Sequence, residues 1–153
     1  MSRGQEFSHG VWKQEPLIHT PRELTHLAKS LTSDSHPDLG TGSPLNTNEL
    51  GYLAGDKWSA EGECDKACRM VHDYLPHGSH VKEYRDSNAN NYQFGNHYVH
   101  HVPTTEGMHV VDYTHRQFNA RAKFPVIEPQ EKFEARKSMQ RFSKNRDVDY
   151  RVL

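Results

Sequence analysis

The chain has 153 residues, enough for one domain, and its mean hydropathy of -0.96 predicts a modest core with polar flanks. Its 19 basic and 20 acidic residues give a formal net charge of -1, which offers no electrostatic case for a nucleic-acid or anionic-membrane partner. The two cysteines are too few for a disulfide framework, and no apolar run approaches the roughly 20 residues of a membrane span.

The N-terminal residues 1–45 are rich in Ser, Thr, Pro, Gly and His and predict a polar, partly disordered arm. A short helix is predicted within it over residues 21–31. Thr20 suits the N-cap, Pro21 the first helical position, and Glu23 completes a capping box. The start of the chain lacks the apolar stretch of a signal peptide. We therefore expect a protein made in the cytoplasm and, if it is secreted or delivered, carried by another route.

A catalytic domain is expected over residues 46–135, and its first strong feature is the run AEGECDKACRM. Gly62 precedes Cys64 at the start of a helix-favouring segment, where the positive end of the helix macrodipole favours a thiolate. Cys68, one turn later, is expected to be buried. Cys64 is therefore the candidate nucleophile. Backbone N–H groups around it, from Gly62 onward, are candidate oxyanion donors, and the side chain of Gln117 is a weaker one.

Two strands are predicted over residues 97–102 and 109–114, joined as a β-hairpin. If residues 103–106 form a four-residue loop, His97 lies directly opposite Asp112. Such opposed residues have Cβ atoms about 4.5–5.5 Å apart, so the carboxylate can hold the imidazole ring. An acid inside an apolar strand is uncommon and itself indicates a partner.

Catalysis by a cysteine nucleophile needs a thiolate, a histidine that takes and returns its proton, and a group that orients the histidine. Cys64, His97 and Asp112 supply these groups in that order along the chain. The residues that follow the domain, 136–153, are charged and predict a C-terminal tail.

Zinc binding is the alternative chemistry for the same region. Cys64, Cys68 and His72 follow one another at four-residue intervals on one helix face, and His97 would complete a Cys₂His₂ set. The three helical residues, however, span about 12 Å of helix rise, which is too far for one ion to contact all of them. We therefore expect no metal and no other cofactor.

Three segments together resemble the papain-fold toxin domains of bacterial polymorphic toxin and effector systems: GEC at a helix start, NHYV, and VVDYTHRQF. The resemblance covers roughly residues 50–130. It implies an α+β fold with a papain-like or transglutaminase-like core, in which the helix bearing Cys64 packs on a small antiparallel sheet bearing His97 and Asp112. Two departures stand out: no aromatic residue follows Cys64 closely, and His115 replaces an expected small residue.

The same resemblance implies acyl transfer on protein amides through a thioester on Cys64, as glutamine deamidation, transamidation or peptide hydrolysis. The implied setting is a bacterial toxin or effector with a protein substrate and a cognate inhibitor. The short separation of the three site residues favours glutamine side-chain chemistry, because a peptide groove needs long flanking segments. The alternative is a non-catalytic binding or structural protein, of phage or secretion-system origin, that retains the fold. The sequence leaves the oligomeric state open.

Overall fold

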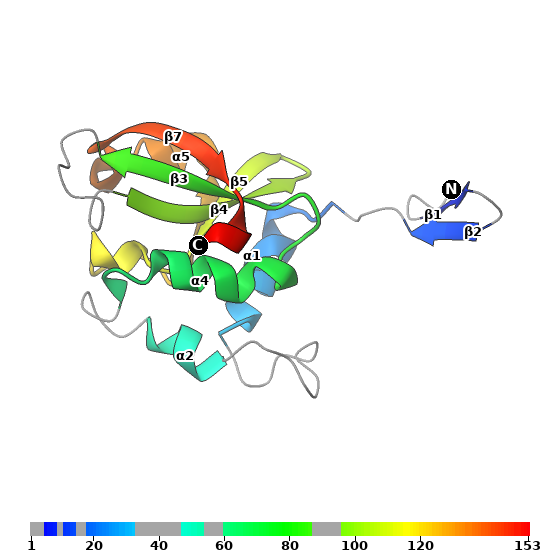
Figure 1. The fold of residues 1–153 in the computed structure, drawn as a ribbon, viewed down its shortest axis with the longest axis horizontal. Coiled ribbons are helices and arrows are strands. Elements are labelled where there is room, and N and C mark those ends of the chain that lie inside the picture. The colour runs from blue at the N-terminus through cyan, green and yellow to red at the C-terminus, as the bar shows by residue number, and fades with distance from the viewer. Residues whose placement is uncertain (1–4, 9–10, 15–17, 33–46, 54–59, 87–95) are drawn as a thin grey trace.

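The computed structural model describes residues 5–8, 11–14, 18–32, 47–53, 60–86 and 96–153. They form an α+β structure around a five-stranded antiparallel sheet with the order β6-β5-β4-β3-β7 (Figure 1). This confirms the predicted α+β class and places β4, the strand of His97, at the centre of the sheet. The strands are β3 (His80–Asp86), β4 (Asn96–Thr104), β5 (Gly107–Asp112), β6 (Val126–Pro129) and β7 (Phe142–Val148).

Helices cover both faces of this sheet (Figure 1). On one face, α1 (Pro21–Ser30), α2 (Thr47–Tyr52) and α4 (Cys64–Val71) form a core with inward side chains of β4 and β5. On the other face, α5 (Gln130–Glu134) contributes Phe133 to a second core. Four short 3-10 turns complete the body: η1 (His72–Tyr74), η2 (His115–Gln117), η3 (Lys137–Met139) and η4 (Tyr150–Val152).

The N-terminal region contains more order than the predicted arm. Strands β1 (Gln5–Ser8) and β2 (Val11–Gln14) pair with each other in a separate two-stranded sheet. Helix α1 begins with the predicted capping box, because the Thr20 hydroxyl accepts from the Glu23 N–H at 3.1 Å and the Glu23 carboxylate accepts from the Thr20 N–H at 2.9 Å. Its Leu24 and Ala28 are fully buried in the main core. Helix α1 is thus part of the folded body.

The C-terminal residues 136–153 are not the charged tail that the sequence predicts. They contain η3, η4 and β7, and β7 pairs with β3 from Val81 to Asp86. Most side chains of β7 are exposed, so the strand lacks the alternating apolar pattern that identifies a half-buried strand. Such a polar, charged strand protects the edge of a sheet against pairing with other chains.

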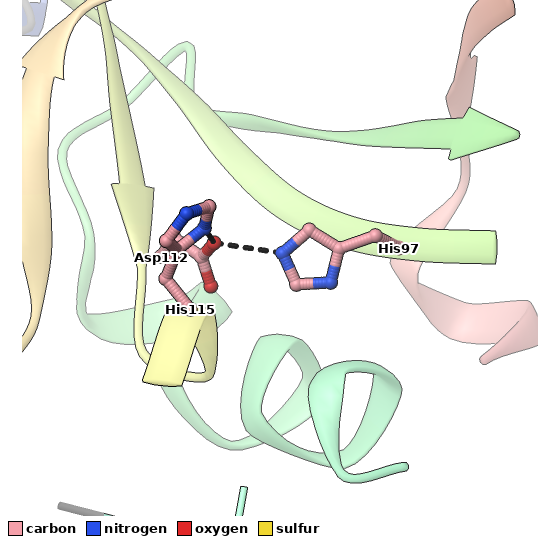
Figure 2. Close-up of side chains that lie close together, drawn as sticks. All are labelled: His97, Asp112 and His115. Atoms are coloured by element: carbon pink, nitrogen blue, oxygen red, sulfur yellow. Dashed lines mark hydrogen bonds and ion pairs between the residues drawn. The ribbon is translucent and has the colours of Figure 1, made fainter. Parts of the chain in front are cut away.

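None of the helices within the described ranges is long and apolar enough to cross a membrane. The body instead has an ordinary layered organisation, in which each helix buries one apolar stripe against the sheet. In this arrangement the start of α4, the start of β4 and the end of β5 lie close together, and the predicted site residues sit at these three ends (Figures 1 and 2).

Candidate active site

Helix α4 carries the candidate nucleophile at its first position, as predicted. Gly62 precedes it with φ of +76°, a left-handed conformation that favours glycine and turns the chain into the helix. Cys64 is 7% exposed and Cys68 is 4% exposed, and both thiols are free. Burial raises the pKa of Cys68 well above its usual range, so this thiol stays protonated and acts as a small apolar packing residue.

The hairpin that carries His97 and Asp112 has a different register from the predicted one. Thr104 pairs with Gly107, so the turn consists of two residues and the predicted loop 103–106 is wrong. Pro103 belongs to β4 instead of the turn, and Gly107 takes a φ of +102°, which suits a glycine directly after a tight turn. Asp112 is therefore a diagonal neighbour of His97 and not its directly opposed partner.

The predicted contact between these two residues nevertheless forms, because diagonal neighbours remain within reach of a long side chain. The Nε2 atom of His97 lies 2.7 Å from Oδ2 of Asp112, and both side chains are almost completely buried (Figure 2). Because Nε2 of His97 bonds Asp112, its Nδ1 is the ring atom left to contact other polar groups. The side-chain amide nitrogen of Gln117 lies 3.3 Å from Nδ1, and Cys64 is close enough to the same imidazole to help raise its pKa.

Electrostatics favour a charged His97–Asp112 pair. Burial alone would lower the pKa of His97, but the Asp112 charge and hydrogen bond, together with Cys64, raise it to about 10. Burial likewise opposes ionisation of Asp112, yet His97 and His115 hold the pKa of this carboxyl well below its usual range. At neutral pH the site therefore contains a carboxylate and an imidazolium, and the imidazolium places a positive charge beside the Cys64 sulfur.

His115 is a site residue that the sequence interpretation did not assign. The turn η2 folds it back after β5, so that its Nδ1 lies 2.9 Å from the same Oδ2 of Asp112 (Figure 2). Its Nε2 lies 2.7 Å from Oγ of Ser138 in η3. The i,i+3 spacing after a strand is a weak sequence signal for the first contact. No signal indicated the second, because Ser138 belongs to the segment interpreted as a tail.

A metal ion is the other possible occupant of this cluster. The ligand atoms of His97, Asp112 and His115 all lie within 4.8 Å of one another. The two nitrogen–oxygen distances of 2.7 and 2.9 Å are those of N–H···O hydrogen bonds. Ligands at about 2.0–2.2 Å from a tetrahedral zinc ion would stand farther apart. The geometry therefore matches hydrogen bonds between these groups and is tighter than a tetrahedral zinc site.

The zinc set considered from the sequence is not assembled either. His72 follows α4 directly, and its Nδ1 lies 2.9 Å from Nε2 of His100. Its ring also stacks on Tyr150 with a centroid distance of 3.7 Å. His72 is thus engaged between β4 and the C-terminal turn η4, away from Cys64.

Strand β4 buries two further histidines, His100 and His101, each 1% exposed. Burial lowers the pKa of His100 to about 3, with help from His72, His80 and His101. Burial also lowers the pKa of His101 to about 4, with help from Lys82 and His80. Both rings are therefore neutral at physiological pH, unlike His97.

These two histidines predict a loss of stability on mild acidification. An unfolded histidine binds a proton below about pH 6.5, whereas the folded rings bind one only near pH 3–4. Between these values the unfolded state holds more protons than the folded state. The free energy of unfolding therefore decreases as the pH is lowered, by up to about 1.4 kcal/mol per pH unit for each ring. Urea unfolding at pH 7 and pH 5 should show this fall.

His97 contributes with the opposite sign, because its pKa is raised: its stabilising charge is complete below about pH 6.5 and is lost only as pH rises through about 10. His100→Gln is the matched control for the acid effect, since glutamine keeps a hydrogen-bonding group but cannot titrate. It should lose less stability than the wild type between pH 7 and pH 5. Equal losses would show that burial of a neutral His100 is not the cause.

The described residues thus pair an imidazole with a buried carboxylate at the ends of β4 and β5, and the start of α4 carries a thiol that influences the pKa of this imidazole. This set of groups can activate a sulfur nucleophile, orient its histidine and return a proton to a leaving group. No protein-family model, curated protein or solved structure matches the chain significantly. The evidence for function is therefore the geometry of the site itself.

Proposed function

We propose that the protein is a cysteine-dependent enzyme that transfers or hydrolyses acyl groups of protein amides, with Cys64 as the nucleophile. The observation that carries this proposal is the pairing of His97 Nε2 with Asp112 Oδ2 at 2.7 Å, beside a helix start whose Cys64 is close enough to influence the pKa of the same ring. A buried imidazole between a thiol and a carboxylate is the arrangement that nucleophilic catalysis by cysteine requires.

In the proposed reaction, the Cys64 sulfur attacks the amide carbonyl carbon, and the carbonyl oxygen takes up the negative charge. The Cys64 backbone N–H is the proposed donor to this oxyanion, because the Glu63 N–H already donates to the Ala60 carbonyl oxygen at 3.2 Å. The amide of Gln117 is a further donor, since it lies 3.3 Å from His97. His97 then protonates the departing nitrogen as the C–N bond breaks, which leaves a thioester. Water or a second amine attacks the thioester carbonyl carbon as His97 accepts its proton. The C–S bond then breaks, and Cys64 leaves as the thiolate beside the imidazolium.

We propose a glutamine side chain as the amide that reacts. Cys64 is only 7% exposed, and the edge of the Phe118 ring packs on His97 with a centroid distance of 4.8 Å. A side-chain amide on a narrow methylene stem suits so enclosed a thiol better than an extended backbone with two flanking residues. The toxin-domain resemblance of the motifs supports a delivered effector with a protein substrate and a cognate inhibitor.

The test is to incubate the full chain with a glutamine-rich unstructured protein, with and without a primary amine, and to follow mass and fragments. Deamidation adds about one dalton, transamidation adds the amine, and proteolysis gives new termini. Cys68→Ala is the matched control, because it removes a thiol four residues away in the same helix. New termini that depend on Cys64 would show that the protein hydrolyses peptide bonds and does not act on glutamine side chains. If no product depends on Cys64, catalysis on glutamine is contradicted.

A further inference from the structure

The carboxylate of Asp112 is held by more donors than its contact with His97 requires. Its Oδ1 accepts from the Thr114 backbone N–H at 2.9 Å, and its Oδ2 accepts from both His97 and His115. His115 is 1% exposed and is itself bonded to Ser138. A continuous chain of polar contacts therefore runs from Ser138 through His115 and Asp112 to His97.

We propose that His115 is a positioning residue, which fixes the Asp112 carboxylate toward His97, and that Ser138 fixes His115 in turn. The inference rests on the proposed function, since it concerns the orientation of the histidine that serves Cys64. It assigns a role to a side chain that stands where the toxin-domain motif would place a small residue.

The direction of each hydrogen bond follows from the chemistry of the groups. Asp112 is ionised and can only accept, so Nδ1 of His115 must carry the proton that bridges the 2.9 Å to Oδ2. On the other side of the ring, Nε2 lies 2.7 Å from the Ser138 hydroxyl, which can either donate or accept. Ser138 thereby holds the ring orientation in which Nδ1 of His115 faces Asp112.

The surroundings of His115 explain how it keeps this orientation. The edge of its ring contacts Phe133 of α5, with centroids 5.4 Å apart, and Phe118 lies against both His115 and His97. Met139, next to Ser138, is buried in the same second core as Phe133. Elements α5 and η3 thus hold His115 against the Asp112 carboxylate, and they lie on the sheet face that carries the second core.

Two substitutions separate a bond to Asp112 from simple filling of space. The Nδ2 atom of asparagine lies, like Nδ1 of histidine, two bonds beyond Cβ. His115→Asn therefore keeps the hydrogen bond to Asp112 and loses the contact with Ser138. Glutamine places its amide one bond farther, so His115→Gln can contact Ser138 but loses the hydrogen bond to Asp112. A merely structural residue would show no preference for asparagine, the smaller of the two.

The readout is the rate of Cys64 alkylation by iodoacetamide at pH 6, which needs no knowledge of the substrate. We expect His115→Asn to remain within about threefold of the wild type and His115→Gln to react at least about tenfold more slowly, the size typical of losing an outer-shell partner. Ser138→Ala should slow the reaction in the same direction by a smaller factor. Thermal denaturation of each variant shows whether it is folded.

His101→Asn and His101→Gln form the matched control pair, because His101 is an equally buried histidine that bonds Tyr84 at 2.9 Å and not Asp112. These two variants should react alike. Equal rates for the two His115 variants would overturn the positioning role while leaving the proposed function intact, provided that His97→Gln slows the reaction. If His97→Gln and Asp112→Asn both react at the wild-type rate, the proposed function falls together with this inference.

Discussion

Replacing Cys64 with alanine should abolish the acyl-transfer activity while leaving the protein folded. The sulfur forms the covalent intermediate in the proposed reaction, and loss of a catalytic nucleophile typically lowers turnover by on the order of 10⁶-fold. The structural cost should be small, because alanine removes only one atom from a side chain at the rim of the core, where Cys64 keeps 7% exposure. Mass spectrometry of a glutamine-containing protein substrate measures the activity, and circular dichroism measures the fold.

Cys68→Ala is the informative comparison, since it makes the same chemical change one helical turn away. Its thiol is buried and protonated, so we expect near wild-type activity and a loss of about 1–2 kcal/mol in the free energy of unfolding. If both variants lose activity equally although both are folded, Cys64 is not the nucleophile.

The position of Cys64 at a helix start and the contact of His97 with Asp112 could be predicted from the sequence, because each has a local signal. Gly62 marks the turn into α4, the apolar strand around Asp112 marks a buried acid in need of a partner, and a hairpin necessarily brings His97 close to it. The contact survived an error of register, since a shift by two residues keeps both side chains on the same sheet face. A shift by one residue would have separated them.

The support of the site from the C-terminal third could not be predicted in this way. Strand β7 exposes most of its side chains and carries no apolar alternation, and Ser138 lies in a short 3-10 turn whose position depends on tertiary packing. Helix α1 was predicted from its capping box, but its place in the main core depends on long-range contacts. One of these is the hydrogen bond from the Tyr113 hydroxyl to the Ala28 carbonyl oxygen, at 2.5 Å.

Asp112→Asn should lower activity strongly, although less than loss of the nucleophile, even though the side chain keeps its shape. In the wild type His97, His115 and the Thr114 N–H all donate to this carboxylate. Asparagine has one acceptor and one donor, so its NH₂ group must face at least one of these N–H groups without a bond. His97 also loses the charge that raises its pKa to about 10 and the acceptor that fixes the orientation of its ring. The equivalent change in a serine-protease triad lowers turnover about 10⁴-fold.

The same substitution should reduce stability, because a buried histidine is left without its charged partner. Removing one member of a buried ion pair typically costs about 3–5 kcal/mol. Asp147→Asn provides the matched control: its carboxylate bonds Lys82 at 2.7 Å but is 68% exposed, so we expect a loss below about 1 kcal/mol. Urea unfolding at pH 7 measures both. An Asp112→Asn protein with wild-type activity and stability would show that the carboxylate charge neither orients His97 nor supports the fold.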